Sequence, residues 1–456
     1  MSSLNDMLDG WRTDSLFRRV LGSSSVLLSS NSISLGLSVV QSILAGRLLG
    51  AAGFGLVGIV MAYSSTVNGL LSFRMSELVV RYAGEQLENG ENARVSSLVK
   101  IAALSEASVS VLAFLFVLLT SGLAATYLSK SPETAWLFML YAIGLLANFN
   151  TETSTGVLQI LGRIKMQGVI HLIQSVITAL IILYAFITQG NLYLVLAAYA
   201  AGKIIQGLGL FIIAWTSLTQ RIGAGWWKRA IGEVPNLKEL MRFGLSSNLS
   251  ATVILIFRES ETLWVGFFLN KEAAGIFKAA YSVVSLLSVP ANPLILSTYP
   301  EINSLVVQKS WRRLTDFLRK ITAVSGVYNL LLAAGFIIFG RWLLSIYGEQ
   351  FTAGYFALVA MLAGFAFNYI FFWNRPLLLA LGKPEYPLKA TMAAGLSKAA
   401  LAFAVVPRYG IAAEAALLSF YYIFSVGAIV RRGWQEIHLQ LKQESIDNEA
   451  TARTGS

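Results

Sequence analysis

The chain has 456 residues, of which 55% are hydrophobic and 13% charged, whereas about a quarter of the residues in an ordinary soluble domain are charged. It contains no cysteine and two histidines, which excludes disulfides, thiolate catalysis, zinc fingers, iron–sulfur clusters and a histidine metal cluster. The formal net charge of +11 comes from 35 Lys and Arg residues dispersed between apolar segments. Such dispersal indicates orientation in a membrane rather than binding to nucleic acid.

The N-terminal region precedes a serine-rich apolar segment and has no small-residue cleavage site. We expect it to stay attached and to lie in the cytoplasm. Apolar segments long enough to cross a bilayer follow at residues 20–46, 53–73, 101–127, 133–160, 166–188, 192–218, 243–268, 273–298, 321–340, 352–380, 390–407 and 411–430. The sequence thus predicts an all-α polytopic membrane protein with twelve transmembrane helices.

The basic residues are divided unequally between the two sides of these helices. The N-terminus, the even-numbered loops and the C-terminal tail hold 25 Lys and Arg, the odd-numbered loops hold five, and five lie inside helices. Positively charged loops face the cytoplasm. This division predicts a multi-pass protein of the cell (inner or plasma) membrane with both termini in the cytoplasm.

The chain resembles itself at an offset of 220 residues. The offset pairs Gly144 with Gly364, and the tripeptide Leu161–Arg163 with Leu381–Lys383. We call two residues that are paired at this offset mates. Because each residue and its mate are six helices apart along the chain, the two halves have the same orientation and form parallel six-helix repeats. We expect them to surround a central cavity. The predicted parts are an N-terminal lobe at 1–218, a cytoplasmic linker at 219–242, a C-terminal lobe at 243–432 and a polar tail at 433–456.

Polar residues inside the membrane are expensive and usually functional, and here they form stripes. On the fourth predicted helix the stripe is Asn148, Thr151, Glu152, Thr155 and Gln159, and on the tenth it is Asn368 and Arg375, which is followed by Pro376. These spacings place each stripe on one face of its helix. We interpret the stripes as the lining of the cavity.

Several ions have two interpretations. Arg258 and Glu261 are three residues apart and are candidates for an ion pair, while Glu259 lies off their face and is a candidate to pair with another helix. Glu106 and Lys203 lie near enough to helix ends to extend their charges toward the interface. The remaining intramembrane cations include Lys278 on the eighth helix and Lys398 on the eleventh.

No enzyme signature occurs in the chain. The phosphate-binding loop, the serine-hydrolase elbow and the H-E-x-x-H zinc motif are all missing. The odd-numbered loops are short, so they offer no platform for a glycosyltransferase or polymerase. We therefore predict a protein that is not an enzyme and needs no cofactor or metal.

Short motifs resemble the polysaccharide flippases of the multidrug/oligosaccharidyl-lipid/polysaccharide exporter superfamily, which move O-antigen and exopolysaccharide repeat units. The opening of that pattern corresponds to Arg47–Gly50 and then Phe54-Gly55. Its second half corresponds to Glu261, Gly275–Phe277 and Ala279–Ser282, with Glu261 in place of the usual Asp. The major facilitator group is a weaker match, since the loop at residues 77–100 lacks its signature.

The resemblance implies a flippase for an undecaprenyl-pyrophosphate-linked oligosaccharide that works by alternating access in cell-surface polysaccharide biosynthesis. The implied partners are this glycan, the bilayer and the polysaccharide polymerase and chain-length proteins. Candidate substrate contacts are Arg258, Lys278, Arg375, Lys398, Asn148 and Asn368, and candidate coupling or ion-pair residues are Glu152, Glu261 and Glu259. The alternatives are a cation-coupled multidrug or small-solute exporter of the same superfamily, and a membrane scaffold for polysaccharide assembly that transports nothing.

Overall fold

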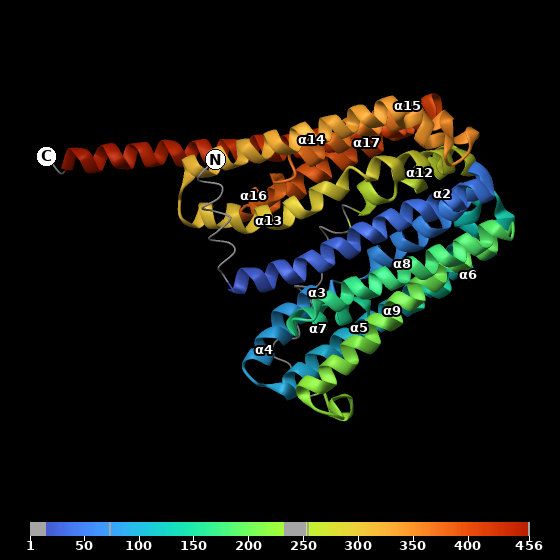
Figure 1. Cartoon of the computed structure of the whole chain (residues 1–456), viewed down its shortest axis with the longest axis horizontal. Coiled ribbons are helices and arrows are strands. Elements are labelled where there is room, and N and C mark those ends of the chain that lie inside the picture. Colours follow the sequence, from blue (N-terminus) through green and yellow to red (C-terminus); the bar gives the residue numbers. More distant parts are fainter. Residues whose placement is uncertain (1–14, 73, 232–251, 253–254, 455–456) are drawn as a thin grey trace. The chain divides into compact units, whose positions relative to one another are not determined.

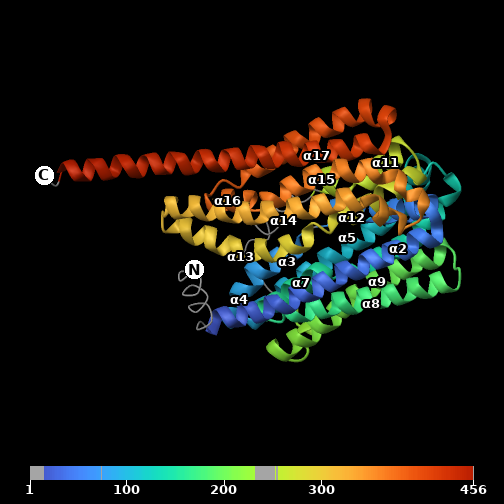
Figure 2. The ribbon, with the colours of Figure 1, turned by 45° about the horizontal axis from the view of Figure 1, so that its top comes forward.

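The computed structural model describes residues 15–72, 74–231, 252 and 255–454, and every regular element in these ranges is helical. The chain divides into two compact units, one made of Met1–Leu49 and Val60–Thr252 and the other of Gly50–Ile59 and Val253–Ser456. Each unit is a bundle of helices (Figures 1 and 2). Residues 50–59 continue a helix of the first unit but pack with the second.

The first unit consists of long helices joined by short turns. Its elements are α2 (Ser15–Leu71, interrupted at Gly50), α3 (Met75–Leu78), the π-helix η1 (Val79–Ala83), α4 (Gly84–Glu88), α5 (Asn92–Tyr127), η2 (Pro132–Thr134), α6 (Ala135–Leu146), α7 (Thr151–Ile160), α8 (Ile164–Ile187), α9 (Leu192–Ile222) and η3 (Trp226–Lys228). Helix α9 packs against α6, α7 and α8, and α5 packs against α6. Apolar side chains also cover the outside, where Leu119 of α5 is 85% exposed. A helix that is apolar all round is typical of a membrane span.

The second unit is also entirely helical within the described residues. Its elements are the π-helix η4 (Leu255–Glu259), α11 (Glu261–Phe268), α12 (Lys271–Ser285), α13 (Ser288–Val307), α14 (Trp311–Ser345), η5 (Glu349–Gly354), α15 (Tyr355–Ile370), α16 (Asn374–Ala380) and α17 (Glu385–Thr454, interrupted at Gly410). Helix α15 packs against α12, α14 and α17. The outer face of α15 is apolar, and its Phe356 is 75% exposed.

The helices account for the predicted segments. Eight helical stretches of the described chain are long and apolar enough to cross a membrane. Two of them, Ile33–Glu88 and Glu385–Glu444, each contain two predicted segments, separated at Gly50 and Gly410. The segment at 273–298 is divided between α12 and α13, and most of the segment at 243–268 that precedes residue 255 lies outside the described residues.

The expected loop at residues 77–100 is helical instead. Elements α3, η1 and α4 fill most of it, and α5 already begins at Asn92. The reason is local burial, because Leu78, Val79 and Leu87 belong to a buried apolar cluster that also contains residues of α5, α7 and α9. Hydropathy averaged over a window does not detect an amphipathic extension of this kind.

The internal repeat is visible in the backbone. Gly162 and Gly382, which are mates at offset 220, both have a positive φ, 66° and 71°, and each ends a broken helix. Another pair of mates, Gly55 and Gly275, are in direct contact within the second unit: a Cβ on Gly55 would lie 1.7 Å from the carbonyl oxygen of Lys271. The reciprocal contact joins Gly275 to the carbonyl of Ala51, at 2.0 Å from an added Cβ. Reciprocal contact between mates is the signature of a local two-fold axis, and only glycine permits so close a backbone approach.

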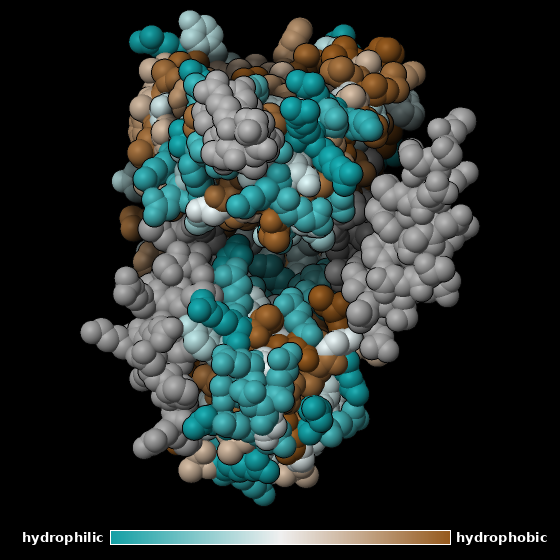
Figure 3. Space-filling view, turned by 90° about the vertical axis from the view of Figure 1, so that its left-hand side faces the viewer, coloured by the Kyte–Doolittle hydropathy of each residue, from teal (hydrophilic) through white to brown (hydrophobic). Residues whose placement is uncertain are grey.

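Hydrophilic residues gather at one end of each unit, as Figure 3 shows. In the first unit this end contains the turn between α7 and α8 and the end of α9, which Arg163 links by donating to Ser217 at 2.8 Å and to Gln220 at 2.9 Å. In the second unit it contains the turn between α16 and α17 and the tail, which Lys383 links through Glu436 at 2.5 Å. Loops predicted to share a side therefore do lie together within each unit. The compartment that this end faces stays a prediction.

Candidate functional site

The fourth predicted helix is broken, and the break exposes the beginning of α7. Helix α6 ends at Leu146 and α7 begins at Thr151. The first N–H groups of a helix have no partner within the helix, and they carry a partial positive charge. Glu106 of α5 supplies the missing acceptors: its Oε1 accepts from the N–H of Glu152 at 2.7 Å and its Oε2 from that of Thr153 at 2.9 Å.

Glu106 therefore does not extend to the interface, and that prediction is wrong. Its side chain is buried, with 5% of its surface exposed. The broken helix gives the carboxylate a partner inside the bundle, so it gains nothing by reaching water. Neither the break nor the cap follows from the spacing of polar residues along the chain.

The predicted stripe on the fourth helix is not one continuous face, because the interruption separates Asn148 from the residues that follow it. Asn148 lies in the break and is half-buried. Glu152 lies in the first turn of α7, is half-buried, and its Oε2 accepts from the hydroxyl of Ser76 at 2.5 Å. Glu152 and Glu106 thus both lie at the beginning of α7, where only Glu106 accepts from the backbone N–H groups.

The tenth predicted helix is broken in the same way. Helix α15 ends at Ile370 and α16 begins at Asn374, so Asn368 and Arg375 lie on different helices and the single face expected for them is wrong. Asn368 is half-buried and Arg375 is exposed in the first turn of α16. Pro376 lies in that first turn as well, where the ring stabilises a helix start instead of kinking a helix interior.

A buried ion triad joins three helical segments of the second unit. The ammonium of Lys398, on α17, forms an ion pair with Oε1 of Glu261, on α11, and lies 3.1 Å from Oε1 of Glu414, farther along α17. The exposed fractions are 1% for Lys398, 2% for Glu261 and 0% for Glu414. Both carboxylates share this one lysine, so their burial depends on it.

The triad corrects one interpretation from the sequence. Lys398 was expected to face a substrate, yet its ammonium is enclosed between two carboxylates. Glu261 was a candidate to pair with Arg258, and its described partner is Lys398. The side chains of Arg258 and Glu259 lie outside the described residues, so their predicted roles stay predictions. Glu414 belongs to none of the local motifs and was given no role from the sequence, because only the folded chain brings it to Lys398.

Lys278 differs from Lys398 in having no acidic partner among the described residues. It lies on α12, half-buried, with its Nζ 4.6 Å from the centroid of the Phe54 ring. A cation over an aromatic face is stabilised without being neutralised. The absence of a side chain at Gly58 leaves room for the side chain of Lys278, since a Cβ there would lie 2.7 Å from Cδ of Lys278. The site therefore leaves the charge of Lys278 without an acidic partner among the described residues.

Lys203 of α9 is arranged similarly in the first unit. Its Nζ lies 5.3 Å from the centroid of the Tyr141 ring, and the residue is half-buried near the middle of α9. The expected extension to a helix end is therefore wrong. The described residues contain no group of three His, Cys, Asp or Glu that could hold a metal ion.

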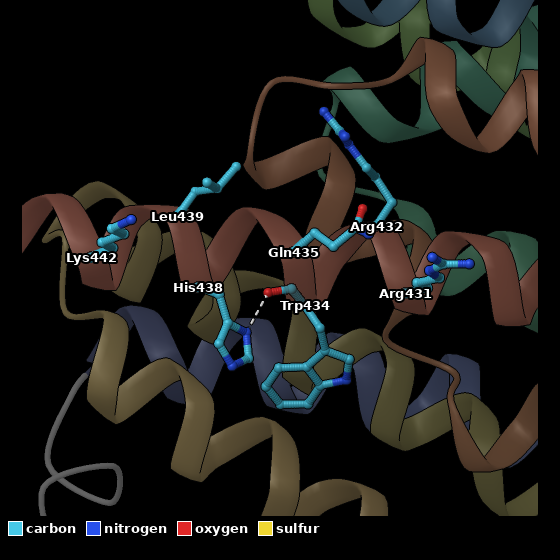
Figure 4. Close-up of a pocket in the computed structure, with 7 residues that line it drawn as sticks. All are labelled: Arg431, Arg432, Trp434, Gln435, His438, Leu439 and Lys442. Carbon is cyan, nitrogen blue, oxygen red and sulfur yellow. Dashed lines mark hydrogen bonds between the residues drawn. The ribbon is translucent and has the colours of Figure 1, made fainter.

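The exposed end of α17 forms a basic surface. Figure 4 shows Arg431, Arg432 and Lys442 on α17, with Trp434 and His438 projecting to the other side from Arg432. These residues line an open pocket of about 740 Å³. Trp434 packs against Trp373, with ring centroids 5.8 Å apart. The predicted polar tail is thus a continuation of the last membrane helix.

Known proteins are similar to this chain in sequence and in fold. A family model described as polysaccharide biosynthesis protein matches residues 20–306, which is more than half of the chain. Inner membrane protein YghQ of Escherichia coli (strain K12) is 24% identical over 347 residues, covering 76% of this chain and 97% of that protein.

Two solved structures illustrate the fold. A multidrug resistance MATE family transporter of the MOP superfamily, in an inward-facing conformation, has a TM-score of 0.69 and 14% identity, covering 89% of this chain and 95% of its own. A MOP superfamily transporter from Pyrococcus furiosus, described as having a binding pocket of reverse polarity that suggests a different function, has a TM-score of 0.61 and 16% identity, covering 94% and 97%. These likenesses confirm the predicted fold of twelve membrane helices in two repeats. The chain is a multi-pass membrane protein that belongs to the polysaccharide biosynthesis protein family.

Proposed function

We propose that this protein is a flippase that moves an undecaprenyl-pyrophosphate-linked oligosaccharide from the cytoplasmic to the extracytoplasmic leaflet by alternating access. The observation that carries the proposal is Lys278, a half-buried ammonium with no acidic partner among the described residues. A pyrophosphate needs such a cation, and a charge-assisted hydrogen bond to phosphate is among the stronger polar contacts in proteins. Membership of a polysaccharide biosynthesis family supports the same class of substrate.

The contacts we assign differ from those expected from the sequence alone. Lys398 is left out because Glu261 and Glu414 already neutralise it. Lys278 and Arg375 remain the candidates for the pyrophosphate, since Arg375 is exposed at the beginning of α16. Guanidinium can bind phosphate through two parallel hydrogen bonds, whereas ammonium acts as a point charge.

The runner-up is a cation-coupled multidrug exporter, which the likeness in fold to the MATE transporter favours. Such an exporter needs carboxylates that are free to bind a cation. Glu106 accepts two backbone N–H groups, and Glu261 and Glu414 hold Lys398. Glu152 is the remaining candidate for coupling, and we retain it in that role under either function.

The test is transport by purified protein in liposomes. The probe is a fluorescent undecaprenyl-pyrophosphate-linked trisaccharide, and ethidium with an imposed proton gradient serves as the drug probe. Lys278→Met should lower glycan translocation about tenfold or more at unchanged thermal stability, and Lys278→Arg should restore part of it. The matched control is Lys389→Met, because Lys389 is exposed and pairs only on the surface with Glu385.

Two results would reject the proposal. One is full glycan translocation by Lys278→Met, which would remove the assigned anion contact. The other is gradient-driven efflux of ethidium by the wild-type protein without any translocation of the glycan lipid, which would establish the exporter instead.

A further inference from the structure

The first unit contains an aromatic-walled cavity that the proposed pyrophosphate contacts do not use. Its volume is about 340 Å³, and its lining comes from α5, α7, α9 and the loop after α9. The residues that carry the argument are Lys100, Asn150, Phe211, Trp215, Trp226 and Trp227. This loop follows the end of α9 (Figure 1).

Hydrogen bonds hold the aromatic wall in place. The Ser96 hydroxyl donates to the carbonyl of Trp226 at 2.9 Å, and the Trp226 indole donates to the Thr219 hydroxyl at 3.1 Å. Lys100 donates to the carbonyl of Arg229. The loop is thus fixed to α5 and α9 before any ligand binds, which lowers the entropy lost on binding.

The indole ring of Trp215 contacts those of Trp226 and Trp227, and the three rings are tilted relative to one another. The ring centroid of Trp215 lies 4.8 Å from that of Trp226 and 5.1 Å from that of Trp227, with interplanar angles of 49° and 37°. Trp226 is 3% exposed and forms the wall, whereas Trp227 is 39% exposed and forms the rim. An exposed indole over a preformed cavity is a surface that a ligand can cover.

The polar side of the cavity has an unused donor. Asn150, at the beginning of α7, is 9% exposed and its Oδ1 accepts from the hydroxyl of Ser154 at 2.9 Å. Its Nδ2 makes no hydrogen bond to any described residue. Nδ2 is not enclosed by protein atoms, so it can donate to a ligand oxygen in the cavity.

We infer that this cavity binds a pyranose ring of the glycan headgroup, an inference that rests on the proposed function. The C–H face of a pyranose packs on indole rings, and its hydroxyls accept from groups such as the Asn150 amide. The volume lies at the lower end of the usual range for ligand pockets, ~300–1,000 Å³, which suits a sugar ring and not a prenyl chain. The ammonium of Lys100 at the lining disfavours a cationic drug, which an aromatic cage otherwise attracts.

The test is saturation-transfer NMR on the purified full-length protein with methyl glucopyranoside, N-acetylglucosamine and rhamnose as pyranose probes and geranyl phosphate as the isoprenoid probe. We expect saturable transfer to the pyranose ring protons, reduced roughly fivefold or more by Trp227→Ala or Asn150→Ala. Trp227→Phe should restore it. Trp342→Ala is the matched control, because Trp342 is 62% exposed on α14 in the other unit.

Each outcome decides the matter separately from the flippase proposal. Absence of saturable transfer from all three pyranoses up to ~50 mM, or equal transfer in wild type and in a monodisperse Trp227→Ala protein, would overturn the sugar site. So would displacement of every pyranose signal by geranyl phosphate, which would identify a lipid-facing aromatic belt. If glycan lipid is nevertheless translocated in liposomes, only this inference fails.

Discussion

Removing the lysine from the buried triad should strongly destabilise the second unit. Lys398→Met leaves Glu261 and Glu414 buried without a cation, and their exposed fractions are 2% and 0%. Removing one partner of a buried ion pair costs about 3–5 kcal/mol because the remaining charge is uncompensated. For a domain of this size, that corresponds to a fall in apparent Tm of roughly 6–20 °C.

The assay must avoid thiol chemistry, since the chain has no cysteine for a thiol-reactive dye. A fusion to a fluorescent protein, heated and then separated by size exclusion, reports the fraction that stays monodisperse. Lys389→Met is the control on the same helix, because its side chain is 74% exposed and its pair with Glu385 spans 3.3 Å at the surface. Exposed pairs contribute little to stability, so the control should melt with the wild type.

Two further variants separate charge from packing. Glu414→Gln leaves Glu261 to neutralise the lysine, so its loss should be smaller than that of Lys398→Met. Combining Lys398→Met with Glu261→Gln and Glu414→Gln removes all three charges and should recover most of the stability. If Lys398→Met and Lys389→Met have the same apparent Tm, the stability of the second unit does not depend on pairing the carboxylates with the lysine, and the reasoning is refuted.

Three other predictions use the same preparation or a simple reporter. Glu106→Gln should lower the free energy of unfolding by about 1–3 kcal/mol, and the apparent Tm with it. The reason is that the amide has one oxygen in place of the two that accept from the N–H groups at the start of α7. An unchanged Tm would contradict the cap. Gly55→Val should abolish monodisperse protein, since a Cβ there would lie 1.7 Å from a backbone carbonyl oxygen, whereas Gly122→Ala, with no atom within 4 Å, should behave as wild type. Reporter fusions after Gln189 and Ser456 should read periplasmic and cytoplasmic, and the opposite readings would reverse the topology.

The sequence predicts the membrane spans well because a span is a local property. A run of apolar residues of sufficient length has to lie in lipid wherever it occurs. The repeat is detectable for a related reason, since the glycines at 162 and 382 supply the same positive φ in equivalent turns. Both signals are contained in a short stretch of chain or in two stretches compared at one offset.

The candidate sites are less predictable because their partners are far apart in the chain. Lys398 and Glu261 are separated by 137 residues, and Glu106 and Glu152 by 46. No spacing rule connects them. The broken helices had weak local signals: Asn150 is a residue type favoured just before a helix, and Pro376 is typical of a first turn. Reading those signals would have divided the two stripes correctly.

The described intramembrane ions can be sorted by whether each has a partner, and the result bears on the choice between the two functions. Glu106 accepts two N–H groups at a helix end, and Glu261 and Glu414 share the single cation Lys398, so the triad holds one more carboxylate than cation. Lys278 has an aromatic face but no carboxylate among the described residues. An exporter of cations would be expected to keep an acidic group unpaired and its lysines neutralised. Glu152, which accepts from the hydroxyl of Ser76, is the acidic group that such an exporter would use. Lys278 and Lys203 both lie over aromatic rings without an acidic partner among the described residues, and such cations support an anionic cargo because a substrate can complement their charge.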